Sequence, residues 1–166
     1  MSQDYILRLI GQLGAMLAAI IAKRRAGLLV EARADVNAFS IQAVGMPLHL
    51  VRQMAPEALT QHLHGSGTPD HARAVILAEL LIQEAEMDES AGNSQAAITG
   101  ALHAFCLLTT SWPHLAADDQ AGYRQKIDIL AAKLAHLSSN PYLAEKLADW
   151  QKLTPLDTPL APAGSA

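Results

Sequence analysis

Three histidines lie closest together among the residues that could carry chemistry. His62, His64 and His71 flank a glycine-rich segment, residues 65–69. Imidazole is a common metal ligand, so three rings in one place could bind a metal ion or a small polar ligand. No cysteine or carboxylate accompanies them at a recognised ligand spacing, and we therefore expect solvated side chains, no metal and no cofactor. A small-ligand or metal site at these histidines is the alternative.

The densest group of carboxylates falls between residues 79 and 89. A carboxylate di-metal site in a helical bundle uses Glu-x-x-His motifs, and the chain contains no such motif. Charge runs of this kind are usually a solvated helix face. That interpretation is expected here for Glu79, Glu84, Glu86, Asp88 and Glu89.

The single cysteine, Cys106, stands between Phe105 and Leu107, and His103 precedes it on the same predicted helix. A reactive thiol requires an accessible, electropositive surrounding, whereas these apolar neighbours indicate a small buried core residue. The sequence also lacks a phosphate-binding loop, a dinucleotide-binding fingerprint, a zinc-protease motif and a nucleophile elbow. We therefore predict that the protein is not an enzyme, and we assign no catalytic residue.

Composition sets the broad class of the protein. The chain has 166 residues, of which 51% are hydrophobic and 4% aromatic, and a formal net charge of −4. This charge argues against a general nucleic-acid binder, because phosphate contacts need clustered Lys and Arg. One cysteine excludes an internal disulfide framework and fits a reducing cytoplasm, where we place the protein. Abundant alanine and the lack of alternating segments predict an all-α fold.

Two helices joined by a tight turn must organise this fold. The first is predicted to be capped by Thr68, to have Pro69 as its first residue and to end near residue 91. Gly92 supplies the left-handed conformation that ends helices, and the second helix extends from about residue 94 to residue 111. Because the first helix is apolar on two sides, we expect it to lie sandwiched inside a bundle.

The spacing of glycine and small or apolar residues in this hairpin recurs near the N-terminus. The two matching sets are Gly27, Ala32 and Phe39, and Gly92, Ala97 and Ala104. A free-standing solenoid needs about three repeats, and this chain has only two such sets. We therefore expect a compact bundle of about six or seven helices with hairpin-like parts.

The remaining segments complete a single domain. Further helices are expected near residues 48–54 and 56–64, near residues 120–137 with Asp118 and Asp119 as caps, and after Asn140 and Pro141. We assign residues 1–153 to one all-helical domain and residues 154–166, rich in Pro and Ala, to a disordered tail.

An apolar segment spans residues 5–22, and three basic residues (23–25) follow it. Asp4 precedes the segment and no small-residue cleavage site follows, so we do not expect a signal peptide. The segment is short for a membrane span of about 20 residues and contains Arg8, which favours a buried helix of a soluble domain and no integral membrane span. The alternative is an amphipathic helix, residues 5–25, that anchors the protein to a membrane surface.

The central hairpin resembles a tetratricopeptide hairpin, since Ala85, Gly92, Ala97 and Ala104 follow its spacing of small residues. The helix order, together with the segments 5–10, 55–59 and 80–86, resembles a family of small bacterial proteins with tetratricopeptide-like hairpins and no assigned activity. This resemblance covers roughly residues 4–108. It implies a fold and no catalytic residues.

In tetratricopeptide hairpins the first helix lines a binding groove. The resemblance implies that Glu79, Ile82, Glu86 and Glu89 face such a groove, and an acidic groove would suit a basic peptide. The favoured function is therefore a non-enzymatic helical module that binds a protein or peptide partner, and self-association as a homodimer is compatible with it. The histidine site and the membrane-surface anchor are the two alternatives.

Overall fold

The structure, a computed structural model, describes residues 3–64, 70–137 and 139–153. These residues form eight α-helices and one short 3-10 helix, with no strand among them, which confirms the predicted all-α bundle. The helices are α1 (Gln3–Arg25), α2 (Leu29–Val44), α3 (Leu48–Val51), α4 (Pro56–His64), α5 (His71–Ser90), α6 (Ser94–Ser111), η1 (Trp112–His114), α7 (Ala117–Leu134) and α8 (Pro141–Leu153). The predicted tail, residues 154–166, lies outside the described residues.

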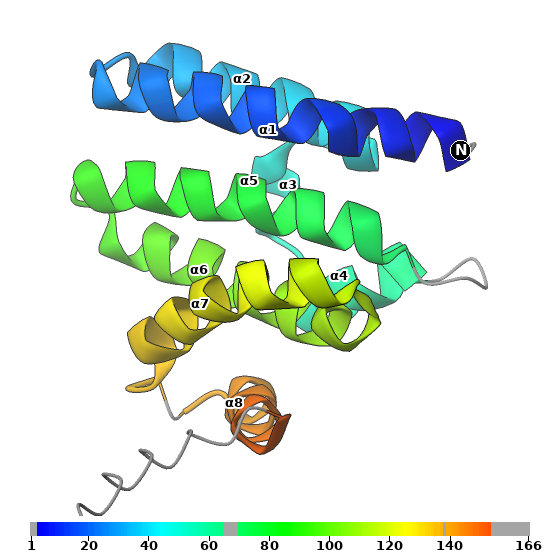
Figure 1. Cartoon of the computed structure of the whole chain (residues 1–166). Helices are drawn as coiled ribbons and strands as arrows, with labels where there is room; N and C mark the ends of the chain where they lie inside the picture. Colours follow the sequence, from blue (N-terminus) through cyan, green and yellow to red (C-terminus); the bar gives the residue numbers. More distant parts are fainter. Residues whose placement is uncertain (1–2, 65–69, 138, 154–166) are drawn as a thin grey trace, which may run out of the picture.

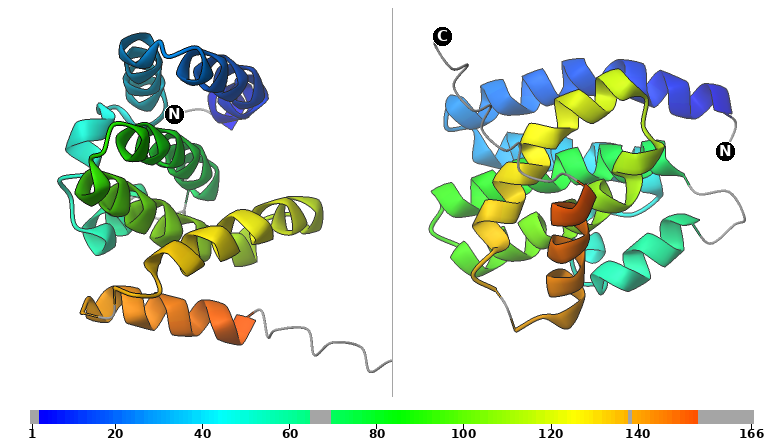
Figure 2. Two further views of the ribbon diagram at one scale, coloured as in Figure 1. Left: turned by 90° about the vertical axis from the view of Figure 1, so that its left-hand side faces the viewer. Right: turned by 60° about the horizontal axis from the view of Figure 1, so that its bottom comes forward.

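The helices stack in layers around α5 and α6 (Figure 1). Helices α1 and α2 form one outer layer, α5 and α6 the middle, and α7 and α8 lie on the opposite side, as the left view in Figure 2 also shows. Helix α5 contacts α1, α2 and α6, and thirteen of its twenty residues are buried. The prediction that this helix is sandwiched inside the bundle is therefore confirmed.

The two hairpins, α1–α2 and α5–α6, turn in the same way. Gly27 and Gly92 both adopt a left-handed conformation, with φ of 78° and 80°. In each turn the N–H that follows this glycine donates back five residues, from Leu28 to Lys23 O at 2.9 Å and from Asn93 to Asp88 O at 2.8 Å. This is the hydrogen bond of a glycine C-cap. The recurring sequence spacing thus corresponds to a recurring turn.

Helices α5 and α6 approach each other closely at Gly100. A Cβ atom at this position would lie 3.3 Å from the Cβ of Ala85 and 3.4 Å from the carbonyl oxygen of Leu81. Glycine at position 100 therefore permits this approach, because a larger side chain there would push the two helices apart.

Two helix starts differ from the sequence-based expectation. The carboxylate of Asp70, and not the predicted Thr68, caps α5 by accepting a hydrogen bond from the Arg73 N–H at 3.0 Å; Thr68 lies outside the described residues. Helix α7 begins at Ala117, so its two aspartates lie in the first turn, where they favour the helix dipole without acting as the cap. The predicted cap of α8 is confirmed, because the Asn140 side chain accepts from the Leu143 N–H at 3.1 Å.

Helix α1 contributes one face to the core. Leu13 and Ile20 are buried, whereas Ala15, Ala18 and Ala22 on its other side are exposed. Within the part of the chain that the structure describes, none of the helices combines the length and the apolar character that crossing a membrane requires.

Candidate functional site: a groove between α1, α5, α6 and α7

A groove with a volume of about 580 Å³ lies between the C-terminal end of α1, the first half of α6 and helices α5 and α7. Its floor is apolar and includes Ile82 and Ala85 of α5 and Ile98 and Ala101 of α6. Helix α7 adds further apolar side chains, among them Ile129. The volume falls within the range of about 300–1,000 Å³ that is usual for ligand pockets.

All four residues that the sequence assigned to a groove line this one: Glu79, Ile82, Glu86 and Glu89. They extend over three turns of α5, which is about 15 Å at 1.5 Å per residue. The structure therefore brings the predicted residues together on one surface. That a partner binds there is still a prediction.

The groove does not have the acidic character that was expected of it. Each of its three carboxylates is paired with a cation that also lines the groove. Lys126 binds Glu79, Arg24 binds Glu86, and Lys133 lies 3.2 Å from Glu89. The sequence could not show these partners, because they come from α1 and α7. The complementarity to a basic peptide therefore loses its basis.

Glu79 is the most deeply placed of the three groove carboxylates, at 2% exposure. Its neighbour Tyr123 is half-buried. Burial, followed by the charge of Glu79 and the hydrogen bond with it, raises the pKa of the Tyr123 phenol. The tyrosine therefore stays protonated, and Glu79 is held between Tyr123 and Lys126 at one end of the groove.

The interpretation of the acidic cluster as a solvated helix face is wrong for three of its five members. Glu79, Glu84 and Asp88 are buried. Because α5 is packed on several sides, carboxylates on it have little access to water and need partners inside the protein. Only Glu86 and Glu89 keep substantial exposure of their side chains, 39% and 62%.

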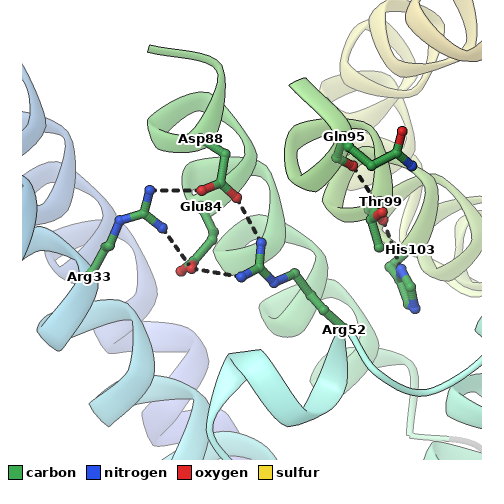
Figure 3. A network of polar contacts seen from close by, with 7 residues as sticks. All are labelled: Arg33, Arg52, Glu84, Asp88, Gln95, Thr99 and His103. Atoms are coloured by element: carbon green, nitrogen blue, oxygen red, sulfur yellow. Dashed lines mark hydrogen bonds and ion pairs between the residues drawn. The ribbon is translucent and has the colours of Figure 1, made fainter. Parts of the chain in front are cut away.

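Glu84 and Asp88 lie in a network with two arginines (Figure 3). Arg33 of α2 donates to Glu84 at 2.9 Å and to Asp88 at 2.8 Å. Arg52, just after α3, donates to the other Asp88 oxygen at 2.7 Å and lies 3.4 Å from Glu84. Two guanidinium groups thus face two carboxylates, and the network joins three segments that are distant in the sequence. It has the geometry of a structural link between α2, α3 and α5.

The environment of Arg33 explains how a partly buried charge is tolerated. Burial by itself would lower the pKa of Arg33, but the hydrogen bond and charge of Asp88 and the charge of Glu84 outweigh it and raise the pKa. The roles of both arginines are not evident from the sequence. The available signal was indirect: Glu84 and Asp88 are spaced by four on a helix predicted to be buried, and such carboxylates require cationic partners.

The histidine site kept as an alternative is not assembled among the described residues. His62 is exposed on α4, and the side chain of His64 lies outside the described residues. The ring of His71 stacks on that of His114, with centroids 4.2 Å apart, and its Nδ1 lies 3.3 Å from Ser111 Oγ. The described part of the chain holds no group of three or more His, Cys, Asp or Glu side chains that could bind a metal ion.

The two remaining candidates on α6 belong to the interior. His103 is buried, and its Nδ1 lies 2.8 Å from Thr99 O (Figure 3). Its Nε2 lies 2.6 Å from Met54 O, so it links α6 to the segment after α3. Cys106 is buried as predicted. Burial raises the pKa of its thiol to about 12, which leaves it protonated and unreactive near neutral pH.

Comparison with known protein families, with curated proteins and with solved structures finds no match to this chain. The resemblance to tetratricopeptide-like bacterial proteins therefore stays a prediction.

Proposed function

We propose that the protein is a non-enzymatic helical interaction module that binds a peptide segment of a partner protein in the groove between α1, α5, α6 and α7. The observation that supports this proposal is the construction of the groove. Its floor is apolar, and ion pairs from α1, α5 and α7 stand along its sides. Burial of apolar side chains on such a floor provides affinity, and polar groups around it fix the orientation of the bound segment.

The dimensions of the groove suit a peptide. Its α5 side, from Glu79 to Glu89, is about 15 Å long at 1.5 Å per residue. That length accommodates three turns of a partner helix or about four to five residues of an extended strand at about 3.3 Å each. The groove also lies on the first helices of both matching hairpins, α1 and α5, which is where the tetratricopeptide resemblance implies a binding surface.

The alternatives have less support from the structure. A histidine site would need His62 near His71, whose ring stacks instead on His114. A membrane-surface anchor inserts large apolar side chains such as Trp, Phe and Leu. From residue 11 onward the exposed side of α1 instead carries small residues, such as Ala15 and Ala18.

The proposal is tested by selecting binders from a random library of displayed 12-residue peptides. The full chain is compared with the variant Ile98→Glu, which places a charge on the apolar floor, and with the matched control Ile41→Glu. Ile41 is 50% exposed on α2 and does not line the groove. We expect peptides that are enriched on the unchanged protein and on Ile41→Glu but not on Ile98→Glu. Circular dichroism confirms that each variant is folded.

Two results would count against a peptide-binding groove. One is a selection that enriches no sequence on the unchanged protein. The other is a set of peptides that bind the Ile98→Glu variant as well as they bind the control, which would place the binding surface elsewhere.

A further inference from the structure

The groove carries more positive than negative groups. Four cationic side chains line it, Arg24, Arg25, Lys126 and Lys133, together with three carboxylates. The ion pairs use three of the four cations. Arg25 is left over: it is exposed and makes no ion pair or side-chain hydrogen bond with a described residue.

The surplus positive charge lies at one end of the groove. Arg25 is the last residue of α1, and His136, which follows the end of α7, lines the groove as well. Figure 1 shows the C-terminal ends of α1, α5 and α7 and the N-terminal end of α6 together at the left. The N-cap residue of α6, Asn93, makes no side-chain cap hydrogen bond, so the first N–H groups of α6 add partial positive charge at this end.

The charge of Arg25 also acts on its neighbour Arg24. Burial and the charge of neighbouring Arg25 lower the pKa of Arg24. Arg24 is paired with Glu86, so the uncompensated guanidinium is that of Arg25. An anion placed beside Arg25 would relieve this repulsion, and a further cation would increase it.

The side-chain oxygen of Gln83 is a second, independent feature of the groove, because it has no hydrogen-bond donor among the described residues. Gln83 lines the groove and is 94% buried, at 6% exposure. Its Oε1 atom is fully buried and accepts no hydrogen bond from any described residue. An unsatisfied buried acceptor is unfavourable, because it has lost its hydrogen bonds to water and gained none within the protein. Rotation of the Gln83 side chain would bring this oxygen into the groove, where an N–H or O–H donor of a bound segment would satisfy it.

Resting on the proposed function, we infer that the natural occupant of the groove is an acidic peptide segment. Its apolar side chains lie on the floor formed by Ile82 and Ile98. An Asp or Glu carboxylate lies at the end marked by Arg25, His136 and the start of α6, and a donor group of the segment binds Gln83 Oε1. This assignment reverses the charge that the sequence alone suggested for the partner.

The peptide selection described above provides the probe. Peptides enriched in a groove-dependent way are synthesised with a fluorescent label, and their Kd values are measured by fluorescence polarisation. We expect these peptides to be net acidic. Arg25→Glu raises their Kd about fivefold or more, because a charge at the edge of a site acts directly on an opposite charge. The matched control Arg8→Glu, a charge reversal at another exposed arginine of α1, leaves Kd unchanged within about twofold.

The buried amide has its own test. Gln83→Leu removes the unsatisfied oxygen, and we expect Kd for the same peptides to rise about three- to tenfold, the value of one hydrogen bond. The unfolding midpoint of the free protein should stay the same or rise, which separates loss of binding from loss of folding.

The outcomes separate this inference from the proposed function. Groove-dependent peptides that are basic or neutral, or equal effects of Arg25→Glu and Arg8→Glu, would overturn the acidic occupant and leave the groove as a peptide site. Inorganic phosphate that binds with the same dependence on Arg25 while no peptide is enriched would assign this end to a small anion and overturn both. A selection without any groove-dependent peptide and without phosphate binding would also overturn both.

Discussion

The network of Arg33, Arg52, Glu84 and Asp88 makes a quantitative prediction through the substitution Asp88→Asn. The Asp88 side chain is 4% exposed and accepts hydrogen bonds from both arginines, at 2.8 Å and 2.7 Å. Asparagine has almost the same shape, but it removes the negative charge and turns one acceptor into an NH₂ group that faces a guanidinium donor.

The expected loss follows from the geometry. Breaking a buried ion pair costs about 3–5 kcal/mol. Arg33 and Arg52 keep 29% and 19% of their side-chain surface exposed, so water partly compensates each guanidinium. Glu84 still accepts a hydrogen bond from Arg33 and stays 3.4 Å from Arg52. We therefore expect Asp88→Asn to lower the free energy of unfolding by about 2–4 kcal/mol.

The assay is chemical denaturation at pH 7 followed by circular dichroism, with the slope against denaturant used to check two-state behaviour. The control is the same substitution at Asp149, which is 51% exposed and pairs with Lys152 on the surface at 3.7 Å. Its expected effect is below about 0.5 kcal/mol. If Asp88→Asn and Asp149→Asn cost the same, the network does not link α2 and α5 energetically, and our account of this core is refuted.

The other predictions concern packing and titration. Gly122 lies within α7 and has open space where a Cβ would stand, so Gly122→Ala should stabilise the protein by about 0.5–1 kcal/mol through helix propensity. In Gly100→Ala the new methyl would lie 3.3 Å from the Cβ of Ala85, so thermal denaturation should show no gain or a loss of stability. Equal gains from the two substitutions would show that α5 and α6 are not in tight contact. Because burial raises the pKa of Cys106 from 9.0 to about 12, the unfolded chain releases this proton first, and stability should fall as the pH rises above 9 by up to about 1.4 kcal/mol per pH unit. Denaturation of the Cys106→Ala variant between pH 8 and 11 should show a shallower fall than the unchanged protein, and parallel curves would contradict the burial of the thiol.

Much of the architecture could be predicted from local patterns. The sandwiched position of α5 follows from its two apolar sides, and the turns at Gly27 and Gly92 follow from a residue type that tolerates positive φ. The cap at Asn140 was equally readable, because Asn followed by Pro marks a helix start.

The groove residues of α5 were predicted, but the electrostatics of the groove was not. Glu79, Glu86 and Glu89 look like an acidic surface as long as α5 is considered alone. Their partners come from α1 and α7, between 44 and 62 positions away in the sequence. Spacing along one helix carries no information about such pairs, because they depend on how the helices stack.

The central claim, that the groove binds a peptide, is tested most directly by methyl NMR of the isoleucine side chains in the full chain. Four isoleucines line the groove, Ile21, Ile82, Ile98 and Ile129, whereas Ile41 lies outside it and Ile76 is buried in the core. On titration with a peptide from the selection, we predict saturable shifts of groove signals at the same Kd as in polarisation, with the signals of Ile41 and Ile76 unchanged. Shifts confined to Ile41, or no shift of the groove signals at saturating peptide, would contradict the account.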